Sequence, residues 1–141
     1  MKKQVVLSIC GKQSYAGQEP DVIELVTDGT LEELTTGCWE ICYEETALTG
    51  MEGVSTSFLV EPGKIVLTRS GKLSSQMIFR EGIPHDSLYQ MQFGALMLSV
   101  TASKMRYELS NEGGTVDLSY SIEIEQTAAG VIDYHLEIKS K

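Results

Sequence analysis

The sequence is poor in proline, in cysteine and in positive charge. Its 141 residues include 3 prolines and 3 cysteines, and 11 Lys and Arg stand against 20 Asp and Glu, for a net charge of −9. Proteins that bind nucleic acid or anionic membranes need clusters of Lys and Arg, and the sequence contains none. No segment approaches the roughly 18 apolar residues of a membrane helix. We therefore expect neither nucleic acid nor membrane as a partner.

The three cysteines, Cys10, Cys38 and Cys42, are an odd number. On one extended strand, Cys38 and Cys42 would lie ~13 Å apart at ~3.3 Å per residue, which is beyond the reach of a disulfide. Their spacing also does not match a zinc site. Unpaired thiols indicate a reducing, cytoplasmic location, and the apolar run 5–10 is too short for a signal peptide and predicts a first strand. We expect no metal and no cofactor.

Short alternating runs separated by glycine turns fill the rest of the chain. The runs 105–109, 116–125 and 132–139 alternate apolar and polar residues almost without error, which is typical of antiparallel strands with one solvated face. Further strands are expected at 22–26, 38–42, 54–61, 64–69 and 73–80, and two more within 88–102. Asp28-Gly29 is a turn signal after the second strand, and Gly94 is expected to break the segment 88–102.

This arrangement predicts an all-β protein. About ten short strands with no amphipathic helix favour a sandwich or a barrel. The connections are mostly hairpins, which favours an up-and-down meander, and closure of the sheet removes its two open edges. We therefore predict an antiparallel up-and-down β-barrel of about 8–10 strands, as a single domain over residues 1–141.

Two charged residues end apolar rows on the faces expected to point inward. Glu45 continues the alternation of strand 38–42 on the face of Trp39 and Ile41, and Arg69 ends strand 64–69 in the same way. A buried carboxylate or guanidinium needs a partner. We therefore expect Glu45 and Arg69 to form an inward pair.

Several phenols and hydroxyls fall on the same inward faces, so the interior is expected to be partly polar. The candidate ligand-binding residues are Glu45, Arg69, Tyr43, Tyr89, Tyr107, Tyr120, Tyr134, Thr56 and Ser75. Two interpretations stay open. The charged pair and the phenols either satisfy one another and fix the strand register, or they bind the polar or anionic head of a small ligand.

Catalytic signatures are scarce. Adjacent strand residues face opposite sides, so Glu44 and Glu45 cannot act as an acid–base pair, and Glu44 is expected at the surface. His85 and His135 are expected at the surface as well. The serines lack a nucleophile elbow, and the glycine-rich segments match no phosphate-binding loop. We name no catalytic residue.

Several segments together resemble one protein family. They are Tyr43-Glu44-Glu45-Thr46, Leu48 to Gly53, Arg69-Ser70-Gly71, Tyr89 with Phe93-Gly94, and Gly113-Gly114 leading into Leu118-Ser119-Tyr120. In order and spacing the chain resembles the YwiB-like family of small bacterial proteins of unknown function. The resemblance implies a calycin-like (lipocalin-like) β-barrel and carries no activity, ligand or catalytic residue with it.

Three functions remain open at this point. The first is a barrel that binds a small polar or anionic molecule in its interior. The second is a filled barrel with a structural or protein-interaction role, as a monomer or a homodimer. The third and weakest is an enzyme that uses Arg69 and Glu45 on an anionic small molecule.

Overall fold

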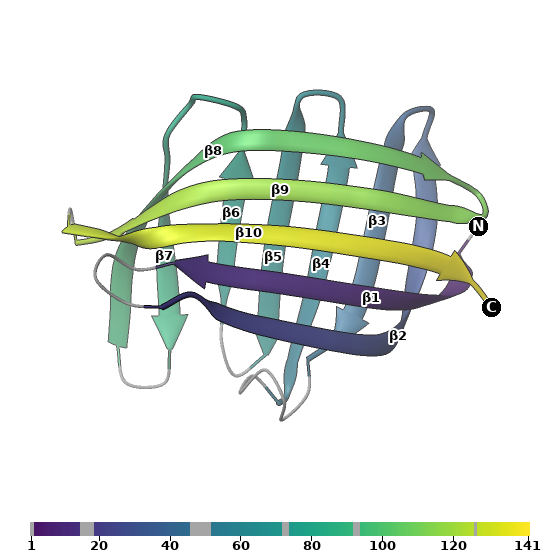
Figure 1. The fold of residues 1–141 in the computed structure, drawn as a ribbon, viewed down its shortest axis with the longest axis horizontal. Coiled ribbons are helices and arrows are strands. Elements are labelled where there is room, and N and C mark those ends of the chain that lie inside the picture. The colour runs from purple at the N-terminus through teal and green to yellow at the C-terminus, as the bar shows by residue number, and fades with distance from the viewer. Residues whose placement is uncertain (1, 15–18, 46–51, 72–73, 92–93, 126) are drawn as a thin grey trace.

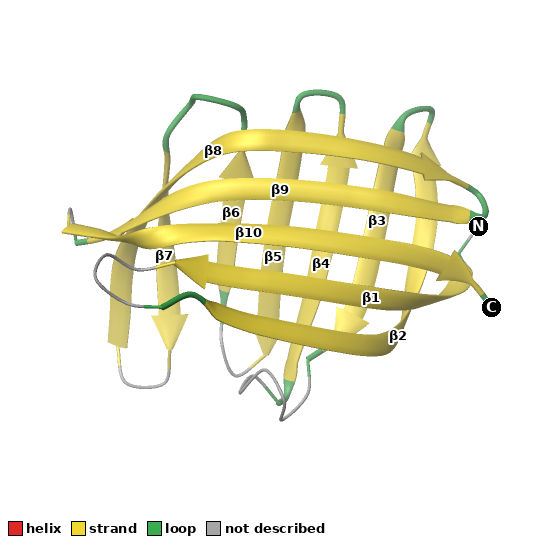
Figure 2. Cartoon of the chain, in the orientation of Figure 1, coloured by secondary structure: helices red, strands yellow, loops and turns green. Residues whose placement is uncertain are grey.

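Ten β-strands make up almost all of the chain that the computed structural model describes, which is residues 2–14, 19–45, 52–71, 74–91, 94–125 and 127–141, without the side chains of residues 89, 91, 128 and 129. The strands are β1 (Lys3–Ser14), β2 (Asp21–Thr35), β3 (Cys38–Glu44), β4 (Val54–Glu61), β5 (Lys64–Gly71), β6 (Ser75–Phe79), β7 (His85–Met91), β8 (Gly94–Ser110), β9 (Gly113–Ile124) and β10 (Thr127–Ser140). None of the described residues is helical (Figure 2). No helix that could cross a membrane is therefore found in these ranges.

The strands form one antiparallel sheet in the order β6-β5-β4-β3-β2-β1-β10-β9-β8-β7. Strands that follow one another in sequence are neighbours in the sheet, with β1 and β10 joining the two ends of the chain. Figure 1 shows β1, β2, β8, β9 and β10 crossing in front of β3 to β7 at a steep angle, so the sheet folds over onto itself. The structure confirms the predicted all-β, antiparallel up-and-down barrel, which is nearly closed.

The space between the two layers is filled by apolar side chains, because each strand turns one alternating face inward. The largest fully buried side chains include Leu7, Leu31, Ile41, Phe58, Ile65, Leu67, Phe79, Leu118, Tyr120 and Leu136. The side chains of β1, β9 and β10 meet those of β3 to β6 in one core cluster. Because this core is apolar, a charged side chain inside the barrel loses its hydration and needs a partner there.

The barrel closes at a seam between β6 and β7, where the two edge strands of the sheet meet. The amide of Ser74 donates to the carbonyl of Gln90 (3.0 Å), and the amide of Gln90 donates back to Ser74 (2.9 Å). Further along, the Ser87 hydroxyl donates to the Gln76 carbonyl. The buried Ser87 hydroxyl thus supplies the hydrogen bond that the Gln76 carbonyl would otherwise need from the backbone amide of a neighbouring strand.

The prediction of a turn at Asp28-Gly29 is wrong, because β2 runs unbroken through both residues. Gly29 is buried and pairs with Val5 on one side and Tyr43 on the other. A Cβ at Gly29 would lie 2.6 Å from the Cys42 carbonyl oxygen and 2.7 Å from Leu7. Glycine is therefore required here for close approach of neighbouring chains rather than for a turn.

The prediction that residues 105–109 form a strand of their own is also wrong, because they belong to the second half of β8. The pairing of β8 with β9 shifts register between Ala102 and Lys104. Such a bulge bends a strand without ending it. In Figure 1, β8 passes from the layer of β7 into the layer of β9 and β10. The predicted break at Gly94 is confirmed, because β7 ends at Met91 and β8 begins at Gly94.

We predict that Ser87→Ala lowers the free energy of unfolding by about 1–2 kcal/mol, because it leaves the Gln76 carbonyl without its donor. Urea denaturation measures the change. Ser121→Ala, at an exposed position of β9, is the control and is expected to change stability by less than about 0.5 kcal/mol. Equal losses in the two variants would contradict a role of Ser87 in closing the seam.

Candidate functional site

The strand register brings four of the candidate residues into one row. Tyr43 pairs with Thr56, Thr56 pairs with Arg69, and Arg69 pairs with Ser75. All four are buried and lie on the inward face of β3 to β6. Glu45 comes directly after β3 and is held against β4 by its amide, which donates to the Val54 carbonyl (2.8 Å).

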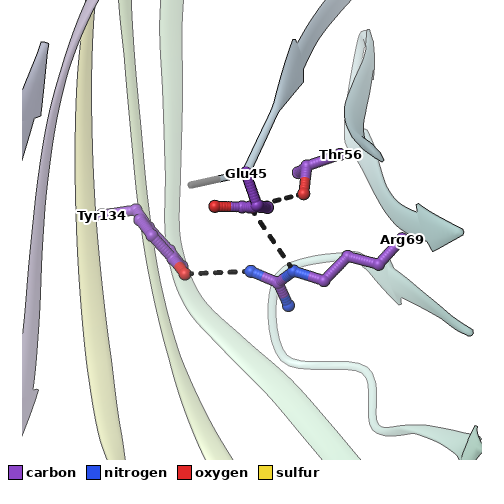
Figure 3. Close-up of polar contacts among 4 residues, drawn as sticks. All are labelled: Glu45, Thr56, Arg69 and Tyr134. Carbon is purple, nitrogen blue, oxygen red and sulfur yellow. Dashed lines mark hydrogen bonds and ion pairs between the residues drawn. The ribbon is translucent and has the colours of Figure 1, made fainter. Parts of the chain in front are cut away.

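Glu45 and Arg69 form the predicted inward pair (Figure 3). Arg69 Nε lies 3.9 Å from Glu45 Oε2, and the two residues are 7% and 5% exposed. This separation is that of an ion pair and is too long for a hydrogen bond. The same Glu45 oxygen accepts a hydrogen bond of 2.5 Å from the Thr56 hydroxyl. Thr56 therefore orients the carboxylate from the neighbouring strand.

Tyr134 reaches Arg69 from the opposite layer of the barrel. Arg69 Nη2 donates to the Tyr134 hydroxyl oxygen at 3.2 Å. The Tyr134 ring lies over Gly11 of the adjacent strand, where a Cβ would be 3.3 Å from the ring. It also stacks with Tyr120, with ring centroids 6.4 Å apart and planes inclined by 23°. The guanidinium of Arg69 on β5 is thus held by Glu45, directly after β3, and by Tyr134 on β10.

Arg69 has more hydrogen-bond donors than acceptors around it. A guanidinium carries five N–H groups. Within the described part of the chain, the Tyr134 hydroxyl is its one hydrogen-bond acceptor, and the buried Nε makes no hydrogen bond. Figure 3 shows the second terminal nitrogen pointing away from both Glu45 and Tyr134. The other buried side-chain atom without a partner is Ser75 Oγ, on the residue directly paired with Arg69.

A cavity of about 90 Å³ lies beside the charged pair. Its polar wall is formed by Tyr43, Glu45, Arg69 and Tyr134, with Gln13. The remaining wall is formed by Ile9, Gly11, Ile23, Leu25 and Ile132. Of these residues, Ile23 on β2 is 41% exposed.

Burial and charge shift the protonation of two residues of the site. Burial, and then the negative charge of Glu45, raises the pKa of the Tyr43 phenol well above its usual range, so the phenol keeps its proton. Burial alone would lower the pKa of Arg69, but the surrounding phenolic oxygens of Tyr134, Tyr120 and Tyr43 outweigh it and the pKa is raised. Arg69 therefore stays positively charged at every accessible pH.

The other candidate residues lie at different distances from this centre. Tyr120 is buried behind Tyr134, and Ser75 lines a groove at the β6–β7 seam together with Arg69 rather than the cavity. Tyr107 faces inward and is only partly buried. It pairs with Val116, whereas the residue level with Tyr134 on β8 is Met105, two positions away. The side chain of Tyr89 lies outside the described residues.

Sequence reasoning missed the wall that faces the charged pair. Gln13, Gly11 and Ile132 line the cavity, yet none of them carries a chemical signal in the sequence. Only the pairing of β1 with β10, which sets Gly11 opposite Tyr134, identifies them.

On the outer surface, His135 Nδ1 lies 2.6 Å from Asp117 Oδ1, and this hydrogen bond is the main cause of the raised pKa of His135. The sequence placed His135 on an outward face but did not indicate its partner. Among the described residues, no group of three or more His, Cys, Asp or Glu side chains is arranged to hold a metal ion.

We predict strong coupling between Glu45 and Arg69. Glu45→Gln and Arg69→Met are each expected to lower the free energy of unfolding by roughly 3–5 kcal/mol, whereas the double variant loses much less than the sum, because it leaves no unpaired buried charge. Urea denaturation of the four proteins gives the coupling energy. Glu44→Gln, at the exposed neighbouring carboxylate, is the control. Additive losses in the double variant would contradict the pairing.

We also predict that stability falls above about pH 10, where the Tyr43 phenol of the unfolded chain ionises. Because the folded-state pKa is raised, the contribution of Tyr43 is complete below that pH and is lost as the pH rises further. The free energy of unfolding of the wild type should therefore fall more steeply between pH 9 and 11.5 than that of Tyr43→Phe. Equal slopes would show that the Tyr43 phenol does not resist ionisation.

Comparisons with known proteins agree with this fold. The chain superposes on the crystal structure of the ywiB protein from Bacillus subtilis with a TM-score of 0.87 and 20% sequence identity, over 99% of this chain and 93% of that chain. At this identity the likeness shows the fold alone. A comparison with curated proteins finds no match.

The family itself is shown by sequence. Residues 7–138 match the model of a domain family of unknown function, DUF1934. The match spans nearly all the strands, from within β1 to within β10. Together with the structural likeness to the ywiB protein, it confirms the resemblance found in the sequence: the chain belongs to the DUF1934 family.

Proposed function

We propose that the barrel interior binds a small polar or anionic ligand and that Arg69 is the residue that holds it. The observation that carries this proposal is the buried guanidinium beside the cavity, whose Nε has no hydrogen-bond partner among the described residues. A buried donor left without an acceptor costs about 1–3 kcal/mol. A ligand oxygen in the cavity would remove that cost.

The residues around Arg69 are suited to orient such a ligand. Tyr43 and Tyr134 place two phenols on the cavity wall. The Glu45 carboxylate accepts a hydrogen bond from Thr56 and lies 3.9 Å from Arg69 Nε, too far to accept a hydrogen bond from the Nε–H group. A ligand oxygen would therefore approach the donors that Glu45 and Tyr134 leave open. Hydrogen bonds between a guanidinium and an anionic oxygen are among the stronger ones in proteins.

The alternative function is a filled barrel with a structural or protein-interaction role, and the size of the cavity favours it. Pockets for drug-sized ligands usually enclose about 300–1,000 Å³, and this cavity encloses about 90 Å³. Any interior ligand is therefore a molecule of a few atoms. The calycin-like classification and the cytoplasmic location remain predictions, and an enzyme acting on an anionic small molecule remains the weakest of the three alternatives.

Thermal unfolding in the presence of small solutes tests the proposal. The panel is acetate, propionate, bicarbonate, phosphate and glycerol. A ligand that binds the native state stabilises it by about 2.7 kcal/mol at a concentration of 100 Kd. We expect at least one anion of the panel to raise the Tm of the wild type in a saturable way.

The double variant Arg69→Met with Glu45→Gln is the control, because it removes the guanidinium without leaving an unpaired charge. It is expected to lose the saturable rise in Tm and to keep only the general effect of salt on burial. Glu44→Gln should respond like the wild type. An equal rise in the double variant, or no rise for any solute in the wild type, would favour the filled barrel.

A further inference from the structure

The size of the cavity limits what can bind beside Arg69. An engineered apolar cavity of about 150 Å³ holds benzene, and one water takes about 30 Å³ of liquid volume. The cavity of about 90 Å³ is thus too small for a ring of six carbons. It fits roughly three to five non-hydrogen atoms.

The lining of the cavity selects the chemistry of those atoms. One end presents the Arg69 guanidinium and the phenols of Tyr43 and Tyr134. The other end presents mainly aliphatic side chains, Ile9, Ile23, Leu25 and Ile132, together with Gly11 and the amide side chain of Gln13, which pairs with Ile132. An inorganic oxyanion would place several oxygens against these aliphatic side chains, where the Gln13 amide replaces only part of the lost hydration. A carboxylate with a short alkyl tail matches both ends.

The charges of the site add a second condition. Arg69 carries one positive charge, and Glu45 Oε2, only 3.9 Å from Nε, already balances it. A second carboxylate in the same buried space would leave a net negative charge. Two carboxylates that share a buried site retain one proton between them, because two like charges repel each other strongly there.

The other titratable groups facing this space cannot offset the extra charge. They are the phenols of Tyr43 on β3, Tyr120 on β9 and Tyr134 on β10. Each is neutral in its protonated form, and a phenol has no further proton to gain. The proton must therefore come from solvent and lie between Glu45 and the ligand.

We propose, on the basis of the proposed function, that the cavity binds a short-chain monocarboxylic acid of two or three carbons, such as propionate, together with one proton shared with Glu45. The proton adds to a carboxylate oxygen and no covalent bond to carbon forms or breaks. Arg69 then faces one negative charge before and after binding. The affinity is highest in mildly acidic solution and falls as the pH rises.

Isothermal titration of the wild type with propionate tests this inference. Measurements at one pH in buffers of different ionisation enthalpy give the number of protons taken up, and we expect about one per propionate. Between pH 6 and 8 the Kd should rise about tenfold per pH unit. Acetate should bind as well, whereas hexanoate and benzoate, which exceed the cavity, should bind at least tenfold more weakly.

Two variants test whether Glu45 is the residue that shares the proton taken up with propionate. Glu45→Gln removes the competing carboxylate, so propionate should bind with no proton uptake, with a Kd independent of pH, and should raise the Tm of this destabilised variant. Glu44→Gln, which changes the adjacent outward carboxylate, should take up one proton like the wild type. The wild-type proton count decides the inference even where Glu45→Gln is too unstable to titrate.

The failures of the two proposals are distinguishable. Arg69-dependent binding of propionate without proton uptake, or binding of phosphate or hexanoate as tight as that of propionate, would overturn this inference and leave an interior anion site in place. No binding of any of these solutes to the wild type or to Glu45→Gln would overturn both.

Discussion

The structure depends on how the barrel accommodates the buried guanidinium of Arg69. A guanidinium cannot lose its proton in a protein, so burial must be offset by acceptors and by negative charge. Glu45 supplies the charge and Tyr134 an acceptor, from opposite layers of the barrel. The centre of the site is therefore a contact between the two layers. Its geometry holds only if both layers keep their registers.

The closure of the barrel maintains those registers. From Gly29 onward β2 pairs with β3 as well as with β1, and the register of β8 against β9 shifts at the bulge between Ala102 and Lys104. The β1–β10 ladder joins the two ends of the chain and places Gly11 opposite Tyr134. Among the described residues, the two buried side-chain atoms without hydrogen-bond partners, Arg69 Nε and Ser75 Oγ, belong to a residue pair beside the β6–β7 seam. Within the described ranges, the buried side-chain atoms that lack a hydrogen bond therefore lie next to each other.

Much of this arrangement follows from alternation in the sequence. Period-two patterns identified most strands and predicted that Glu45 and Arg69 point inward, because the face of a strand residue follows from its position in the pattern. Periodicity does not give the depth of a residue along the barrel, so Tyr107 was grouped with Tyr134 although it lies on another row. Asp28-Gly29 has the composition of a turn, but close packing against Cys42 and Leu7 requires the glycine within a strand. The cavity wall from β1 and β10 needs a pairing of distant strands, which local patterns do not contain.

The central claim is that Arg69 keeps donors available for an oxygen that none of the described residues supplies. The NMR signal of the Arg69 Nε–H group reports this most directly, because its proton shift responds to hydrogen bonding. The account predicts a downfield shift that saturates as propionate is added at pH 6, with no such shift in any signal of the double variant Arg69→Met with Glu45→Gln. An Arg69 Nε–H signal that stays unchanged at saturating propionate would contradict it.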